Sequence, residues 1–119
     1  MKYVVLLVDY PEGTPVWGEM PEAQRQAYYD AHVGFAKEAA ARPGVEILAG
    51  EALSDGSAAT VMRPGADGKP VLTDGSYTES IELIGGFYLM EVDDLDALVS
   101  VCEVLPPYVI ELRPVVDVG

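Results

Sequence analysis

The chain has 119 residues, half of them apolar, and a formal net charge of -13 from 20 acidic and 7 basic side chains, which suits a single globular domain over residues 1–119. Such an acidic surface repels nucleic-acid phosphates and anionic lipids. We therefore expect neither a nucleic acid nor a membrane as a partner. With one Cys and one His, the chain cannot form an internal disulfide or a His/Cys metal site, and we expect no metal.

The first half of the chain predicts a strand, a loop, a helix and a second strand. Residues 2–9 are an apolar strand, too short to span a membrane and without a signal-peptide cleavage site. The single cysteine, which cannot form an internal disulfide, suits a cytoplasmic protein. Residues 10–20 contain two prolines and two glycines and form a loop with Trp17 as its large anchor. A helix over residues 21–42 precedes a strand over residues 45–50. The packing stripe predicted for this helix is Ala27, Ala31, Phe35 and Ala39.

The middle of the chain predicts a β-hairpin. Two short strands, residues 58–63 and 69–73, flank a Gly-rich connection in which Asp67-Gly68 is suited to a turn. A second Asp-Gly pair, Asp74-Gly75, follows the hairpin, and no apolar strand comes directly after it.

The last third predicts a strand, a helix and a final strand, over residues 87–92, 93–105 and 108–116. Asp93 or Asp94 can cap the helix. The predicted apolar face of this helix consists of Leu95, Leu98, Val99 and Cys102.

The order of these elements is the ferredoxin-like α+β pattern, β-α-β-β-α-β, with an inserted β-hairpin. Both helices then pack on one face of an antiparallel sheet, and a second face in water should carry polar residues. Residues 3–8 are apolar on both sides, and residues 87–90 are nearly so. A second copy of the chain is the expected cover, which predicts a homodimer.

The segment TDGSYTESIELIGGFYLMEVDDLD, with the end strands MKYVVLLV and IELRPV, resembles the YCII-related family in its DGPF-type branch. The likeness covers nearly the whole chain. Three residues depart from the usual motif: Ser76 replaces a proline, Tyr77 a phenylalanine, and Ile81 a residue that is often basic. The matching positions are Asp74-Gly75, Glu79, Glu82, Gly85-Gly86 and Tyr88-Leu89.

The resemblance implies a dimeric α/β barrel and an active site formed by Asp74 and His32. Most members of this family have no known function, and they are called enzymes because of that pair. Some relatives are encoded beside extracytoplasmic-function sigma factors, which implies a regulatory alternative.

Each residue of the pair also has an ordinary interpretation. His32, the only histidine, lies at the edge of the predicted packing stripe; its imidazole suits proton transfer, but it could be a boundary residue with one hydrogen bond. Asp74 could form a turn, although Asp67-Gly68 already supplies one for the hairpin. We expect Asp74 to contact His32 and to raise its pKa.

Aromatic residues could line a pocket beside this pair. Trp17, Tyr28, Tyr29 and Tyr77 could supply apolar walls with polar tips, although each could equally be a packing residue. Cys102, on the apolar face of the second helix, is expected to be a buried, inert thiol.

Two functions fit these observations. The first is a small cofactor-independent enzyme of isomerase, lyase or hydrolase type, in which His32 moves a proton and Asp74 orients the ring. The second is a non-catalytic dimeric module that binds a ligand or a partner in regulation.

Overall fold

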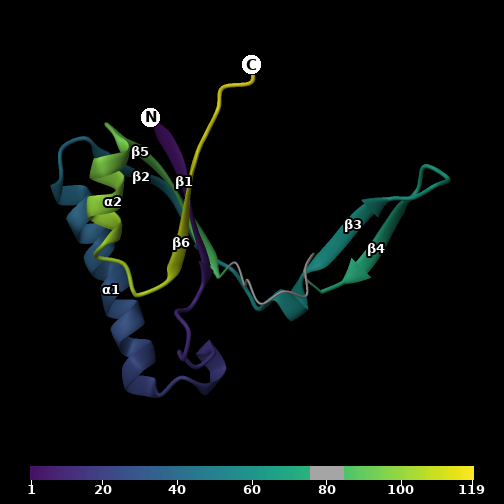
Figure 1. The fold of residues 1–119 in the computed structure, drawn as a ribbon, viewed down its shortest axis with the longest axis horizontal. Helices are drawn as coiled ribbons and strands as arrows, with labels where there is room; N and C mark the ends of the chain where they lie inside the picture. The colour runs from purple at the N-terminus through teal and green to yellow at the C-terminus, as the bar shows by residue number, and fades with distance from the viewer. Residues whose placement is uncertain (76–84) are drawn as a thin grey trace.

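The computed structural model describes residues 1–75 and 85–119, which form a four-stranded sheet, two helices and a separate hairpin (Figure 1). Two short 3₁₀ turns, Trp17–Glu19 and Gly56–Ala58, interrupt the loops. The main elements are β1 (Lys2–Asp9), α1 (Glu22–Ala41), β2 (Val45–Ala52), β3 (Thr60–Pro64), β4 (Pro70–Asp74), β5 (Gly86–Val92), α2 (Leu95–Cys102) and β6 (Val109–Pro114).

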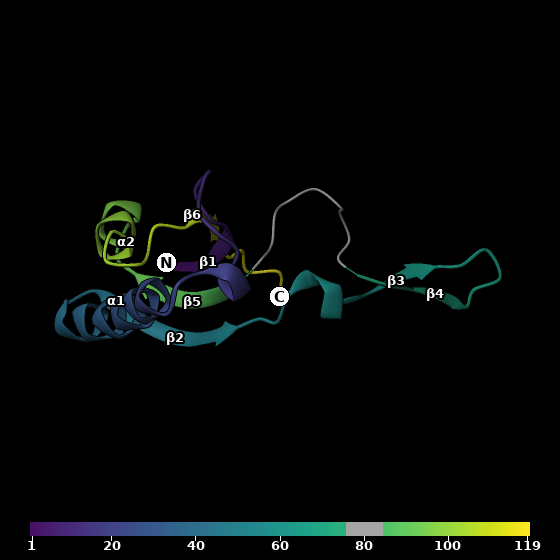
Figure 2. The same ribbon diagram turned by 90° about the horizontal axis from the view of Figure 1, so that it is seen from below.

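The main sheet has the strand order β2-β5-β1-β6, and each neighbouring pair is antiparallel. Both helices lie on the same side of this sheet (Figure 2). The predicted α+β ferredoxin-like pattern with an inserted hairpin is therefore confirmed. Among the described residues, no helix is long and apolar enough to cross a membrane.

The core lies between the sheet and the helices. Tyr3, Val5 and Leu7 alternate along β1 and are buried on the helix side, whereas Val4 and Leu6 point to the opposite face and are half-buried. This alternation follows from the two-residue period of a strand. The core cluster on the helix side includes Phe35, Ala39, Met90, Val92, Leu98, Val101 and Leu105.

The helix faces differ in part from those predicted. In α1 the buried residues are Tyr28, Phe35 and Ala39, and Ala27 is exposed, so the packing stripe runs one position later at its start. His32 falls on this stripe, one turn after Tyr28. The predicted stripe joined small residues at a spacing of four, but the larger Tyr28 side chain buries more apolar surface.

Helix α2 begins as predicted and packs through a shifted face. The Asp94 carboxylate accepts a hydrogen bond from the Ala97 N–H at 2.8 Å, which caps the helix. The predictions for Leu95 and Val99 were wrong, since both side chains are exposed. The buried face of this eight-residue helix is narrow and consists of Leu98, Val101 and Cys102.

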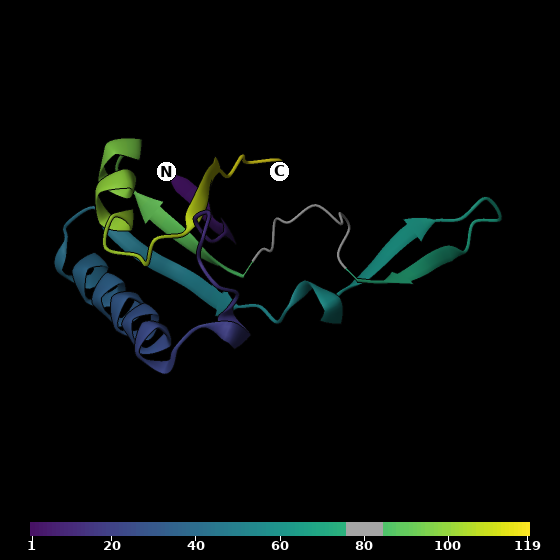
Figure 3. The ribbon, with the colours of Figure 1, turned by 60° about the horizontal axis from the view of Figure 1, so that its bottom comes forward.

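Strands β3 and β4 form a hairpin that extends away from the rest of the chain (Figure 3). The predicted turn is confirmed: Gly68 has a φ of 81° and Asp67 accepts a hydrogen bond from the Lys69 N–H at 3.0 Å. Met62 and Leu72 pair across the strands and are 69% and 65% exposed. A two-stranded hairpin with such exposed apolar residues gains little stability from its own contacts.

Candidate functional site

A cavity of about 820 Å³ opens at the end of the main sheet where β1 stops and β5 starts. The first half of α1 forms one wall, the loop of residues 10–20 another, and the end of β2 with the Gly56–Ala58 turn a third. A pocket of this size can hold a small organic molecule. Of the residues predicted to form a site, Trp17, Tyr28, Tyr29 and His32 line this cavity.

His32 bridges two tyrosine hydroxyls at the base of the cavity. Its Nδ1 lies 2.6 Å from the Tyr88 hydroxyl oxygen, and its Nε2 lies 2.9 Å from the Tyr108 hydroxyl oxygen. Tyr88 reaches the ring from β5, and Tyr108 reaches it from the segment just before β6. Three elements distant in sequence therefore meet at one imidazole.

The environment keeps all three groups uncharged near neutral pH. Burial lowers the pKa of His32 and raises the pKa values of Tyr88 and Tyr108. In a neutral imidazole one nitrogen donates a hydrogen bond and the other accepts one. The shorter distance suits a hydroxyl donor and the longer one suits an N–H donor. We therefore infer that the Tyr88 hydroxyl donates to Nδ1 and that Nε2–H donates to the Tyr108 oxygen.

Beside this trio, aromatic rings pack edge to face. Trp17 contacts Tyr29 with ring centroids 5.3 Å apart, and Tyr28 contacts Tyr108 at 5.4 Å. Tyr28 is only 4% exposed, and its hydroxyl has no hydrogen-bond partner among residues 1–75 and 85–119. An unpaired buried hydroxyl costs free energy, so a ligand or a water molecule that bonds to it would stabilise the site.

Close packing at Gly50 holds Tyr88 in place. Gly50 lies opposite Tyr88 in the β2–β5 register, and a Cβ atom built at Gly50 would lie 2.6 Å from a carbon of the Tyr88 ring. Glycine therefore makes room for the ring. The Tyr88 ring also contacts Phe35, with ring centroids 4.8 Å apart.

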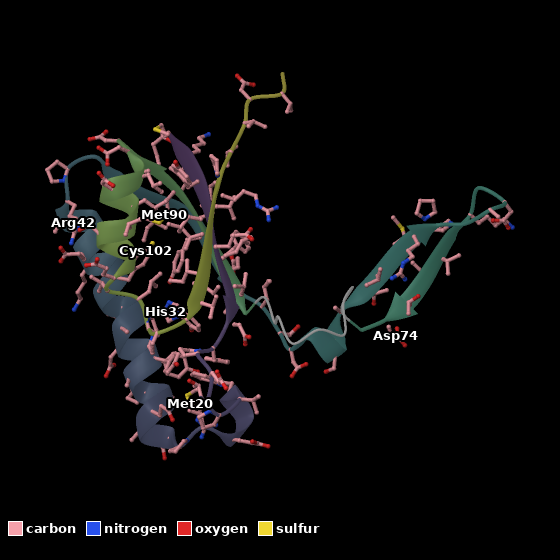
Figure 4. All side chains as sticks on the ribbon, viewed as in Figure 1. Met20, His32, Arg42, Asp74, Met90 and Cys102 are labelled. Carbon is pink, nitrogen blue, oxygen red and sulfur yellow. The ribbon has the colours of Figure 1, made fainter. Side chains whose placement is uncertain are left out.

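Asp74 does not meet His32 within one chain. It ends β4, pairs with Thr60 in the hairpin and is exposed, and Figure 4 shows it well away from His32. Gly75 follows with a φ of 97°, a value that favours glycine, and donates its N–H to the Ala59 oxygen at 2.7 Å, a cross-strand bond that continues the pairing of β3 with β4. The expected contact between the two side chains is therefore wrong for a single chain, because the hairpin carries Asp74 away from the helix.

The expected pKa shift of His32 is corrected for the same reason. We expected a carboxylate to raise this pKa, but burial lowers it, and among the described residues the partners of the two ring nitrogens are tyrosine hydroxyls. Tyr77, which was also predicted to line the pocket, lies outside the described residues.

The sequence interpretation missed Tyr10, Tyr88 and Tyr108. Tyr88 had one available indication: it shares the helix-facing side of β5 with Met90 and Val92, and a strand residue on the core side is well placed to reach a helix. Tyr10 and Tyr108 lie in loops next to strands, where no sequence period applies.

The chemistry of the site also depends on whether the described residues include a metal-binding cluster or a reactive thiol. Among the described residues, no group of three or more His, Cys, Asp or Glu side chains is placed to hold a metal ion. Cys102 is buried, and burial raises its pKa to about 11, so the thiol stays protonated.

Comparison with known proteins identifies the domain. The family model described as the YCII-related domain matches residues 1–118. No curated protein matches the chain.

Proposed function

We propose that this chain, which belongs to the YCII-related family, binds a small organic molecule in the cavity and moves a proton on it without a cofactor. The observation that carries this proposal is the bridge from Tyr88 through His32 to Tyr108, at the base of a cavity large enough for such a ligand. The motif around Asp74-Gly75 further supports membership of the DGPF-type branch.

The bridge suits proton transfer because its two ends are different. The Tyr88 oxygen donates its proton to Nδ1 and keeps lone pairs that can accept a proton from a ligand. The Tyr108 oxygen accepts from Nε2–H and keeps its own proton, which it can donate. With the histidine neutral and both phenols protonated, the trio can receive a proton at one end and release one at the other.

A proton shift within the ligand follows from this arrangement. A ligand C–H or O–H proton passes to the Tyr88 oxygen while Tyr88 passes its own proton to Nδ1, which leaves an imidazolium and an anionic ligand. The imidazolium then gives its Nε2 proton to the Tyr108 oxygen while the Tyr108 hydroxyl protonates the ligand at another atom. The ligand loses one proton and gains one, and the ring ends protonated on Nδ1. This is isomerase chemistry, and the relay can then run in the opposite direction.

The proposal also includes a homodimer formed through the face of the main sheet opposite the helices. Val4, Leu6, Phe87 and Leu89 alternate with the buried positions of β1 and β5, and so they point to that face. A stable interface of this kind buries more than roughly 2,000 Å² in total. Light scattering at micromolar concentration should show a dimer, and a stable monomer would refute this part.

The function is tested in two steps. A thermal-shift screen of small organic molecules, followed by Trp17 fluorescence, should identify ligands of the cavity, since the only tryptophan lines it. NMR in D₂O should then show deuterium entering the ligand with the wild-type protein and not with His32→Gln. A Tyr108→Phe variant should retain binding and exchange much more slowly.

A non-catalytic ligand-binding module is the second candidate. It is favoured by the fact that both nitrogens of His32 are already bonded to protein hydroxyls, as in a structural hydrogen-bond network. A ligand that binds in the cavity but takes up no deuterium and is not altered would support this module.

A further inference from the structure

The walls of the cavity carry negative charge and no side chain that is positive at neutral pH. Among the described residues that line it there is no Lys or Arg, whereas Asp9, Glu51 and Asp55 are present. The sequence of residues 76–84 also contains no basic residue. The chain as a whole has seven basic side chains, so their absence here leaves the cavity without a counter-charge for an anion.

The apolar walls are mostly aromatic. Among the described residues, six aromatic side chains line the cavity: Tyr10, Trp17, Tyr28, Tyr29, Tyr88 and Tyr108. The faces of such rings carry partial negative charge and attract cations, and quaternary ammonium groups are often recognised in this way. The edge-to-face packing of Trp17 on Tyr28 and Tyr29, with interplanar angles of 79° and 86°, turns neighbouring rings in different directions, so they can offer faces to one group from several sides.

We propose that the cavity selects an organic cation, with an ammonium group against the aromatic rings and the carboxylates of Asp9 and Asp55 around it. This inference names the ligand class for the binding function proposed above and rests on it. The uncharged end of the ligand then faces the hydroxyls of Tyr108 and Tyr28, of which the second has no partner among the described residues.

The charges expected in solution agree with this selection. Hydrogen bonds from Ser57 lower the pKa of Asp55, so this carboxylate is ionised throughout the neutral range. Burial lowers the pKa of His32, so the ring adds no positive charge near neutral pH. An anionic ligand such as a carboxylate or a phosphate would lose its hydration and would face the carboxylates of Asp9 and Asp55, with no positive side chain among the described lining residues to offset them.

Three probes of one shape test the selection. Choline, its uncharged carbon isostere neohexyl alcohol, and the anion tert-butylacetate share a bulky branched head and differ in charge. Calorimetry and Trp17 fluorescence on the wild-type protein should show choline binding at least about tenfold more tightly than the alcohol, as expected for a partly desolvated cation–π contact. The anion should not bind measurably.

Matched variants locate the effect. Asp9→Asn keeps an oxygen that can accept the hydrogen bond from the Tyr10 N–H, and it should weaken choline binding several-fold and leave binding of the alcohol unchanged. Glu103→Gln removes the same charge from an exposed position outside the cavity and should change neither. Tyr29→Leu, at an exposed position on the rim, should weaken choline more than the alcohol.

Several outcomes would overturn the proposal. They are equal binding of choline and the alcohol, tighter binding of the anion, no binding of choline at millimolar concentration, or equal effects of Asp9→Asn and Glu103→Gln. If another ligand class binds in the cavity, the cation proposal fails while the binding function stands. If no molecule in the broad screen changes the melting temperature, the binding function itself fails.

Discussion

Replacing Gly50 by alanine tests whether packing against β2 positions the Tyr88 ring. The new Cβ would lie 2.6 and 2.9 Å from two carbons of that ring, closer than carbon atoms normally approach. The ring cannot move away freely, because its hydroxyl bonds to His32 and the ring also contacts Phe35. The substitution must therefore displace either the ring or the strand.

The expected loss exceeds the ordinary gain from removing a glycine. An alanine in a strand is more stable than glycine by about 0.5–1 kcal/mol, and the φ of Gly50 is not positive, so the backbone accepts the change. Overpacking costs about 1–3 kcal/mol, and a buried histidine nitrogen that loses its partner costs a similar amount. We expect a net loss of about 1–2 kcal/mol in the free energy of unfolding.

Urea unfolding followed by circular dichroism measures this loss. Gly18→Ala is the control, because a Cβ atom there meets nothing within 4 Å, and it should change stability by less than about 0.5 kcal/mol. In a Tyr88→Ala background, Gly50→Ala should become neutral or stabilising. The reasoning fails if Gly50→Ala is as stable as the wild type, or if its cost persists when the Tyr88 ring is absent.

Three further predictions follow from the described contacts. NMR titration of His32 should give a pKa below 6.5, so the unfolded chain binds the proton more tightly than the folded one. The free energy of unfolding should therefore fall, relative to that of His32→Gln, as the pH drops from about 6.5 toward the folded-state pKa, by at most about 1.4 kcal/mol per pH unit. The same pH dependence of stability in the wild type and in His32→Gln would contradict this. Asp74→Asn should leave that titration curve unchanged, and a shifted curve would mean that a second copy brings Asp74 to the ring. Asp94→Ala should cost about 1 kcal/mol through loss of the helix cap, as measured by urea unfolding, while Asp96→Ala, in the first turn of α2, should cost less.

The fold could be predicted from the sequence because its indications are local. The apolar run of β1, the Asp67-Gly68 turn and the Asp94 cap each depend on a few neighbouring residues, and the structure contains all three. The order of such elements then restricts the topology.

The site could be predicted only in part, because it depends on how elements that are distant in sequence are oriented relative to one another. His32 and Trp17 were identified from their chemistry, and both line the cavity. The predicted contact between His32 and Asp74 was wrong for a single chain, because the direction in which the hairpin projects cannot be predicted from its sequence. Tyr88 was read as an ordinary strand residue, since its contact with His32 spans 56 positions of the chain.

The burial of Cys102 has a practical consequence for spectroscopy. It is the only thiol in the chain, and since it is buried and has a pKa of about 11, it should remain unmodified under neutral labelling conditions. The natural sequence therefore already serves as a background without a reactive thiol. A single cysteine introduced at Ala66, at the exposed tip of the hairpin, would carry one nitroxide per chain, and the dipolar coupling between two nitroxides would report how far apart the tips lie in an assembly of two copies.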